Sequence, residues 1–242
     1  MPTEPDILVF QHMPCQNPGI FRQYASGRNI RFDEIDLHAG EPIPDIRRYD
    51  GLWVMGGTMN VWEEDEFPWL REEKDAIREA VGRSIPYLGI CLGHQLLADA
   101  LGGTVTRTDC IEIGSHAIEP TEEGAGHRFL DGLCGDIRWA NVHTAEVRRP
   151  PANATILARS RVCPNHAMSV GDSAYSVQFH PEVCRDTLSG WLAIPQIVLF
   201  MTGLLGADGL EAFTAGIETN RESTERGAGR LLDNWLSLTF GR

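Results

Sequence analysis

The chain has 242 residues, of which 42% are hydrophobic and 23% charged, and its formal net charge is −13. A chain of this size can bury a core without disulfides or a structural metal, and its negative field disfavours nucleic acid and anionic membranes as partners. The six cysteines form no CxxC pair, and the N-terminal residues lack the pattern of a signal peptide. Both features predict a cytoplasmic protein with reduced thiols.

Short β-rich runs alternate with helical patterns over the first hundred residues. Strands are predicted over residues 6–10, 30–37, 51–55 and 85–90, and helices at 21–25, 68–83 and 93–101. The 68–83 segment has apolar residues at helical spacing, with acidic residues early and arginine late, as the helix dipole favours. This alternation predicts an α/β fold with a flavodoxin-like, doubly wound and mostly parallel sheet, covered by helices on both faces.

The rest of the chain divides into a β-rich part and a helical part. From 103 to 183, short β-runs are separated by Gly, Pro and Asn turns, and the segment from about 187 to 240 has a helical pattern. We expect one domain over residues 1–242, with a core at about 6–185 and extra C-terminal helices.

One apolar stretch, residues 191–207, raises the question of a membrane segment. It contains Pro195, Gln196 and Thr202, and so falls short of the ~18 to 20 unbroken apolar residues that a span needs. We therefore expect a buried helix here, and no membrane partner.

The pentapeptide from Gly89 to Gly93 places Cys91 between two glycines, where a strand is expected to turn into a helix. This G-x-C-x-G pattern is the thiol counterpart of the nucleophile elbow. Glycines relieve crowding beside a strained residue, the helix N-terminus favours a thiolate, and the N–H of Leu92 is a natural oxyanion donor. By itself, the pattern fits a buried structural cysteine equally well.

A cysteine nucleophile usually needs a base, and among the eight histidines His180 is the best candidate. It ends a β-run two residues before Glu182, and residues i and i+2 of an extended chain lie on the same side. Glu182 can therefore accept the Nδ1–H of His180 and leave Nε2 facing Cys91. Gly56-Gly57 follows another buried strand at the same sheet edge, where a free N–H can complete an oxyanion hole.

Together these blocks resemble a known family. The segments "PYLGICLGHQLLADALGG", "SVQFHPEV" and "VMGGTMNVW" are similar to the signature blocks of class I (triad-type) glutamine amidotransferases, in family order and over roughly residues 6–185. The resemblance is to a stand-alone member, similar to the amidotransferase domain of GMP synthase.

The resemblance implies a role for each matching residue. Cys91 would attack the γ-carboxamide of glutamine and form a glutamyl thioester, and His180 and Glu182 would complete the triad. The oxyanion donors would be Gly57 and Leu92. Residues implied to contact the substrate are Gly56, Gln95, Asn141, Val142 and His143. The resemblance implies no cofactor, and we expect His94 to pack near the site rather than to catalyse.

Two departures from the family pattern bear on the substrate. Thr58 replaces the proline of the usual G-G-P loop. His143 matches the block that usually reads H-G-D, but Ala145 stands at the acidic position and Glu146 comes one place later. Recognition of a free α-amino group, and with it a strict preference for free glutamine, therefore stays open.

Three functions remain open. The chain could hydrolyse glutamine and deliver ammonia to a separate synthase subunit, because no synthase domain is recognisable after residue 183. It could instead hydrolyse γ-glutamyl peptides or γ-glutamyl amines with the same triad. A silent member that binds a ligand without turnover is disfavoured by the intact triad. The oligomeric state is not predicted.

Two pairs have spacing that resembles metal ligands, Cys91-x-x-His94 and His180-x-x-x-Cys184. Zinc sites usually need four such ligands, or three and a water molecule. The nucleophile elbow accounts better for Cys91, so we expect no metal at these residues.

Overall fold

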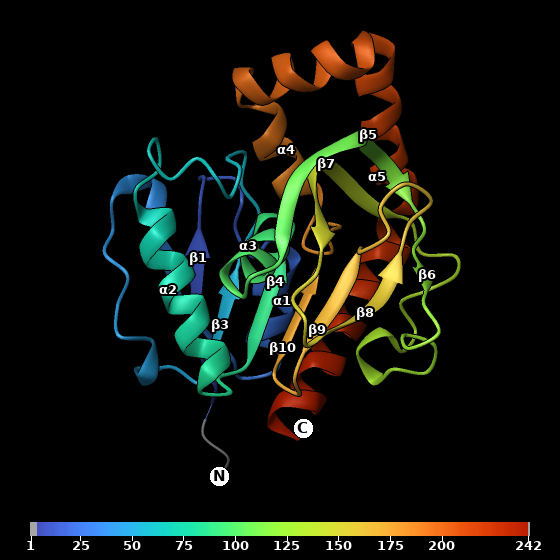
Figure 1. Cartoon of the computed structure of the whole chain (residues 1–242). Helices are drawn as coiled ribbons and strands as arrows, with labels where there is room; N and C mark the ends of the chain where they lie inside the picture. Colours follow the sequence, from blue (N-terminus) through green and yellow to red (C-terminus); the bar gives the residue numbers. More distant parts are fainter. Residues whose placement is uncertain (1–3, 242) are drawn as a thin grey trace.

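The computed structural model describes residues 4–241 and is built around an eight-stranded sheet with a separate two-stranded ribbon (Figure 1). The strand order of the large sheet is β2-β1-β3-β4-β10-β9-β8-β6. Its strands are β1 (Asp6–Gln11), β2 (Arg31–Asp36), β3 (Gly51–Val54), β4 (Tyr87–Ile90), β6 (Glu119–Pro120), β8 (Ala154–Arg159), β9 (Ala167–Val170) and β10 (Ala174–Val177). The first five strands in this order are parallel and the rest antiparallel, which confirms the predicted mostly parallel sheet.

Helices cover both faces of this sheet because successive apolar side chains along its strands point to opposite faces. Ile7 and Val9 belong to one buried cluster, and Leu8 and Phe10 belong to another. The helices are α1 (Ile20–Ser26), α2 (Trp69–Gly82), α3 (Leu92–Ala100), α4 (Arg185–Leu192) and α5 (Pro195–Phe240). α2 and α3 pack on the second cluster, and α1 and the end of α5 on the first. Short 3-10 turns lie at Leu37–Ala39, Ile46–Arg48 and Arg128–Leu130.

The ribbon consists of β5 (Thr104–His116) and β7 (Trp139–Arg149), which run antiparallel. It meets the large sheet where β10 has already ended: the N–H of His180 donates to Ala140 O at 2.9 Å. His180 therefore lies beyond the strand on which the sequence placed it, at the junction of sheet and ribbon. The carboxyl ends of the parallel strands open toward this junction, where ligands bind in such sheets.

The first part of α5 differs from the expectation of a buried helix. It is helical, but Leu199 and Phe200 are 72% and 46% exposed, and only Ile197 and Met201 are buried in this part. By length and composition α5 could span a membrane, and 17% of its most apolar window is buried. The expected burial is wrong because this part packs along a narrow stripe beside α4 and the site. At Gly206, φ is 73°, and the chain turns there to run back behind the sheet (Figure 1).

Candidate active site

Cys91 sits on a sharp turn between β4 and α3. Its φ is 53°, in the left-handed region that non-glycine residues rarely adopt. A Cβ on Gly89 would lie 2.6 Å from Gly93 O, and a Cβ on Gly93 would lie 2.1 Å from Val54 O. Side chains at either flank would therefore push the strand and helix apart. The turn has the geometry that the glycine spacing predicts, and Cys91 is 5% exposed.

His180 lies between Cys91 and Glu182. Its Nδ1 is 2.7 Å from Glu182 Oε1, and both side chains are 2% exposed. Burial lowers the pKa of His180, but the charges of Glu182 and Cys91 and their hydrogen bonds outweigh it and raise that pKa well above its usual value. The Trp191 ring packs against the imidazole in a T-shaped arrangement, with centroids 5.2 Å apart. The ring is thus held in one orientation by a carboxylate and an indole.

Two glutamines complete the surroundings of the thiol. Gln178 Nε2 donates to Cys91 Sγ at 3.6 Å, and Gln95 Nε2 donates to Gln178 Oε1 at 3.1 Å and to Ala145 O at 3.0 Å. Gln95 was expected near the substrate, whereas Gln178 was missed. Its place in the "SVQFHPEV" block, two residues before His180, is the signal that could have indicated it.

The glycine loop after β3 is held by a second buried histidine, His12, which the sequence reasoning missed. His12 Nδ1–H donates to Gly56 O at 2.8 Å, and Nε2 lies 2.9 Å from Glu73 Oε1. In a trans peptide the carbonyl oxygen and the next N–H point in opposite directions. The bond from His12 therefore turns the Gly57 N–H away from His12, and Gly57 lines the same pocket as Cys91.

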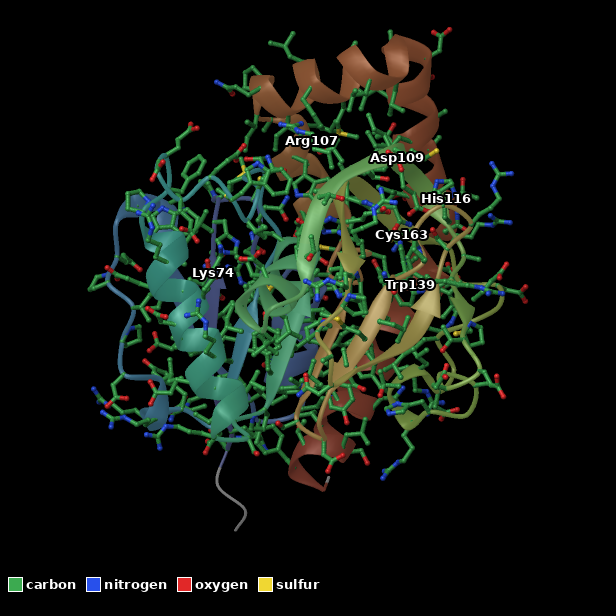
Figure 2. The ribbon with its side chains drawn as sticks, in the orientation of Figure 1. Lys74, Arg107, Asp109, His116, Trp139 and Cys163 are labelled. Carbon is green, nitrogen blue, oxygen red and sulfur yellow. The ribbon has the colours of Figure 1, made fainter. Side chains whose placement is uncertain are left out.

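The pocket over Cys91 has a volume of about 340 Å³ and is largely apolar. One wall comes from the ribbon, at Val142 to Ala145, and another from α5, at Ile197, Phe200 and Met201. Arg107, on β5, also lines it (Figure 2). No acidic side chain among residues 4–241 lines this pocket. Glu146, which follows the expected acidic position, is buried elsewhere and pairs with Arg148 at 3.1 Å.

The structure brings most of the expected site residues together. Those that line the pocket are Cys91, Gly57, Gln95, Val142, His143 and His180, with Glu182 behind His180. Two expected substrate contacts do not line it. Asn141 is fully buried and its Nδ2 donates to Trp139 O at 2.9 Å within its own strand. Gly56 directs its carbonyl oxygen to His12, so its contribution is to orient the loop.

His94 packs under the site, as expected. Its Nδ1 is 2.8 Å from Ser176 Oγ and its Nε2 is 2.9 Å from Asn165 O, and burial lowers its pKa to about 3. Both ring nitrogens have partners, so this imidazole links α3 to the loop after β8. Cys184 likewise caps α4, and neither spacing noted in the sequence forms a ligand set.

Comparison with known proteins decides the family. A model of the family "Glutamine amidotransferase class-I" matches residues 23–189. The chain belongs to the class I glutamine amidotransferases. This amidotransferase is also similar in structure to a glutamine amidotransferase from Thermotoga maritima, with a TM-score of 0.84, 26% identity, and coverage of 96% of this chain and 98% of that one. It is similar as well to a glutamine amidotransferase from Methylobacillus flagellatus, with a TM-score of 0.81, 27% identity, and coverage of 97% of this chain and 95% of that one.

Among curated relatives, the amidotransferase is 36% identical over 160 residues to the glutamine-hydrolysing GMP synthase of Aeropyrum pernix, which is 64% of this chain but 29% of that protein. It is 38% identical over 144 residues to one subunit of the glutamine-hydrolysing GMP synthase of Sulfurisphaera tokodaii, covering 59% of this chain and 72% of that subunit. The chain thus spans less than a third of the first relative.

Proposed function

We propose that this amidotransferase hydrolyses the γ-carboxamide of glutamine through a glutamyl thioester on Cys91. The observation that supports it best is the buried Cys91, His180 and Glu182 set at the floor of an open pocket, with the Gly57 loop beside it. A nucleophile, an oriented base and free backbone donors are the parts that acyl transfer requires.

The steps follow from this arrangement. His180 Nε2 takes the proton of Cys91 Sγ, and the thiolate attacks the amide carbon while the N–H groups of Gly57 and Leu92 stabilise the oxyanion. The C–N bond breaks as His180 returns the proton to the leaving nitrogen, which departs as ammonia. His180 then deprotonates a water molecule, which attacks the thioester, and glutamate leaves as Cys91 regains its proton. Glu182 holds the imidazolium in place at each step.

A second substrate class is favoured by the pocket itself. It has no described carboxylate to bind an α-amino group, and α5 adds apolar side chains to one wall. Such a wall suits an apolar group on the leaving nitrogen, as in a γ-glutamyl amine or peptide, which the same triad would cleave to release an amine. If ammonia is the product, a separate synthase subunit would accept it, as the name of the Sulfurisphaera tokodaii relative suggests. All six cysteines are free thiols, as expected for action in the cytoplasm.

The test is a panel of glutamine, γ-glutamyl peptides and γ-glutamyl amines, with release of ammonia or amine as the measurement. Cys91→Ser is expected to lower turnover by about 10⁴-fold or more, whereas Cys134→Ser, at a half-buried thiol outside the pocket, keeps it. A glutamine analogue carrying a diazo-ketone should label Cys91 alone. Absence of turnover on every substrate, together with an unlabelled Cys91, would contradict both enzymatic functions and leave a silent binding protein.

A further inference from the structure

A second cluster of buried polar side chains lies beside the pocket, and of its members only His143 lines the pocket. It consists of Glu112 on β5, His143 on β7, and Cys163 and His166 in the loop between β8 and β9 (Figure 2 labels Cys163). Each of these residues is 5% exposed or less. Glu112 and His143 are direct partners in the register of the ribbon, and the Cys163-x-x-His166 loop folds against them.

The donor atoms of this cluster, which we call the ribbon cluster, converge. Glu112 Oε2 is 2.9 Å from His143 Nε2 and 3.2 Å from His166 Nε2. Single donor atoms of His143, Cys163 and His166 all lie within 4.8 Å of one another. Ligand atoms on a tetrahedral zinc ion lie roughly 3.3–3.8 Å apart, given bonds of about 2.0–2.3 Å. Shifts of this scale would bring the two imidazoles and the Cys163 thiolate onto one ion. Glu112 contacts both imidazoles but lies outside this group of three, so it would complete the set by turning its carboxylate toward the ion.

Both ring nitrogens of His143 face oxygen atoms that act as acceptors. Its Nδ1 lies 3.1 Å from Ala145 O, a carbonyl that can only accept. A neutral imidazole has a single N–H, and donating it to Ala145 O turns the bare Nε2 toward the Glu112 carboxylate. Two lone pairs would then face each other at 2.9 Å. A metal ion bound between Nε2 and the carboxylate would be coordinated by both of these lone pairs.

We propose that Glu112, His143, Cys163 and His166 bind one divalent cation of the zinc class. Imidazole nitrogens with a thiolate and a carboxylate are the ligands that zinc takes in tetrahedral sites. The charges balance, since a divalent cation, one carboxylate and one thiolate sum to zero, and binding releases the Cys163 proton to solvent. Ion-pair partners of Glu112 within residues 4–241 are these two imidazoles, with no Lys or Arg.

Neighbouring groups support some of these ligands, whereas the buried Nδ1 of His166 has no hydrogen-bond partner among residues 4–241. With an ion on Nε2, His143 would donate its Nδ1–H to a backbone carbonyl, as metal-bound histidines usually do. Ser160 Oγ accepts the N–H of Cys163 at 3.0 Å and so holds the turn that carries this thiol. Metal ligands are commonly positioned by hydrogen-bonded neighbours of this kind.

The ion would have a structural role: it would stabilise the residues around the active site and take no part in the reaction. Four protein ligands close a zinc site to substrate. The ion would hold the loop whose Asn165 O binds His94, and His94 lies on the helix that follows Cys91. It would also fix His143 in the pocket wall.

The experiment is metal analysis of the full chain purified without chelator, followed by replacement with Co²⁺. We expect about one zinc ion per chain, and a cobalt form with the sulfur-to-metal absorption of a thiolate ligand and the intense bands of a tetrahedral ion. Ser160→Ala should weaken binding by about 10- to 100-fold. Cys163→Ser should abolish the sulfur absorption, while Cys134→Ser, at a thiol outside the ribbon cluster, keeps it.

Cys91→Ser separates this proposal from the catalytic one. It is expected to abolish turnover and to keep the cobalt spectrum, because Cys91 is not a ligand. If the wild-type chain holds no metal and Co²⁺ gives no sulfur absorption, the metal proposal is overturned. The same holds if the absorption persists in Cys163→Ser. Wild-type protein alone decides the first of these outcomes, so misfolding of a variant cannot obscure it.

Discussion

Two of the buried histidine–glutamate pairs lie at the nucleophile and at its glycine loop, and they differ in what the imidazole faces. In one pair, His180 Nδ1 is 2.7 Å from Glu182 and the imidazole lines the pocket with Cys91. In the other, His12 Nε2 is 2.9 Å from Glu73 and Nδ1 faces the carbonyl of Gly56. The first pair can exchange a proton with a sulfur, whereas the second meets an acceptor that has no proton to exchange.

This difference shows how the same two residue types serve two tasks. A carboxylate beside a histidine favours the protonated ring in both pairs, and the pKa of each histidine is raised against the effect of burial. For His180, that proton is within reach of the reacting groups. For His12, the charge is a fixed donor that orients the Gly56–Gly57 peptide. We therefore expect His180 to act in proton transfer and His12 to act as a positioning residue.

The largest expected effect comes from replacing each histidine with glutamine. His180→Gln removes the base and should lower kcat by about 10⁴-fold or more. His12→Gln should lower kcat by about 10- to 100-fold, since loss of a complete oxyanion donor costs about 10²–10³-fold. Steady-state kinetics on the best substrate of the panel measures both.

Alkylation of Cys91 by iodoacetamide provides the control, because that reaction forms no oxyanion. We expect His12→Gln to leave the alkylation rate unchanged while kcat falls, and His180→Gln to slow alkylation as well. A His12→Gln enzyme with normal kcat, or with alkylation slowed in step with kcat, would rule out the positioning role.

The second prediction concerns stability and pH, and applies to His12. Burial lowers its pKa, but the charge of Glu73 and hydrogen bonds to Glu73 and Gly56 raise it above 6.5 overall. The stability gained from a raised pKa is fully present below the unfolded value and is lost as pH rises through the folded value. The free energy of unfolding of wild-type protein should therefore exceed that of His12→Gln at low pH. This difference should shrink above pH 6.5, by at most about 1.4 kcal/mol per pH unit.

Denaturant unfolding of both proteins across this pH range measures the effect. The difference between the two curves isolates His12, because His180 contributes equally to both. At low pH the advantage of wild type should be about 3–5 kcal/mol, as for a buried pair that loses one partner. A difference that stays constant, or grows, as pH rises would show that His12 is not charged in the folded state.

The two pairs also mark how far the sequence could predict the site. The elbow at Cys91 and the closeness of His180 to Glu182 depend on neighbouring residues, through glycine sterics and the two-residue period of extended chain. The parallel sheet followed likewise from alternating local patterns. His12 and Glu73 are 61 positions apart, and they meet only because the end of β1 lies beside α2.

Other features required the tertiary structure for similar reasons. Asn141 was expected in the pocket with its neighbours, but next to it Ala140 bridges to His180, and its own side chain turns into the core. The ribbon cluster joins three segments, and only its Cys163-x-x-His166 spacing is visible in the sequence. Exposure of α5 at Leu199 depends on which stripe packs against α4. The periodicity of neighbouring residues predicts that these helices and strands form. It does not predict which of their faces pack against one another.

The smallest expected effect comes from a substitution at Arg107. It tests whether substrate binding is independent of the His180–Glu182 and His12–Glu73 pairs. Arg107 lines the pocket from β5 and is exposed, so it can pair with the carboxylate of a γ-glutamyl group without altering either histidine. Arg107→Ala should raise KM by about 10-fold, equivalent to about 1.4 kcal/mol, and leave kcat within about twofold, as expected when uniform binding is lost. Arg148→Ala, which removes a partner of Glu146 outside the pocket, is the matched control and should leave KM unchanged. A fall in kcat with constant KM would instead show that Arg107 stabilises the transition state. Its guanidinium would then act near the oxyanion, which the His12–Glu73 pair helps to stabilise through the glycine loop.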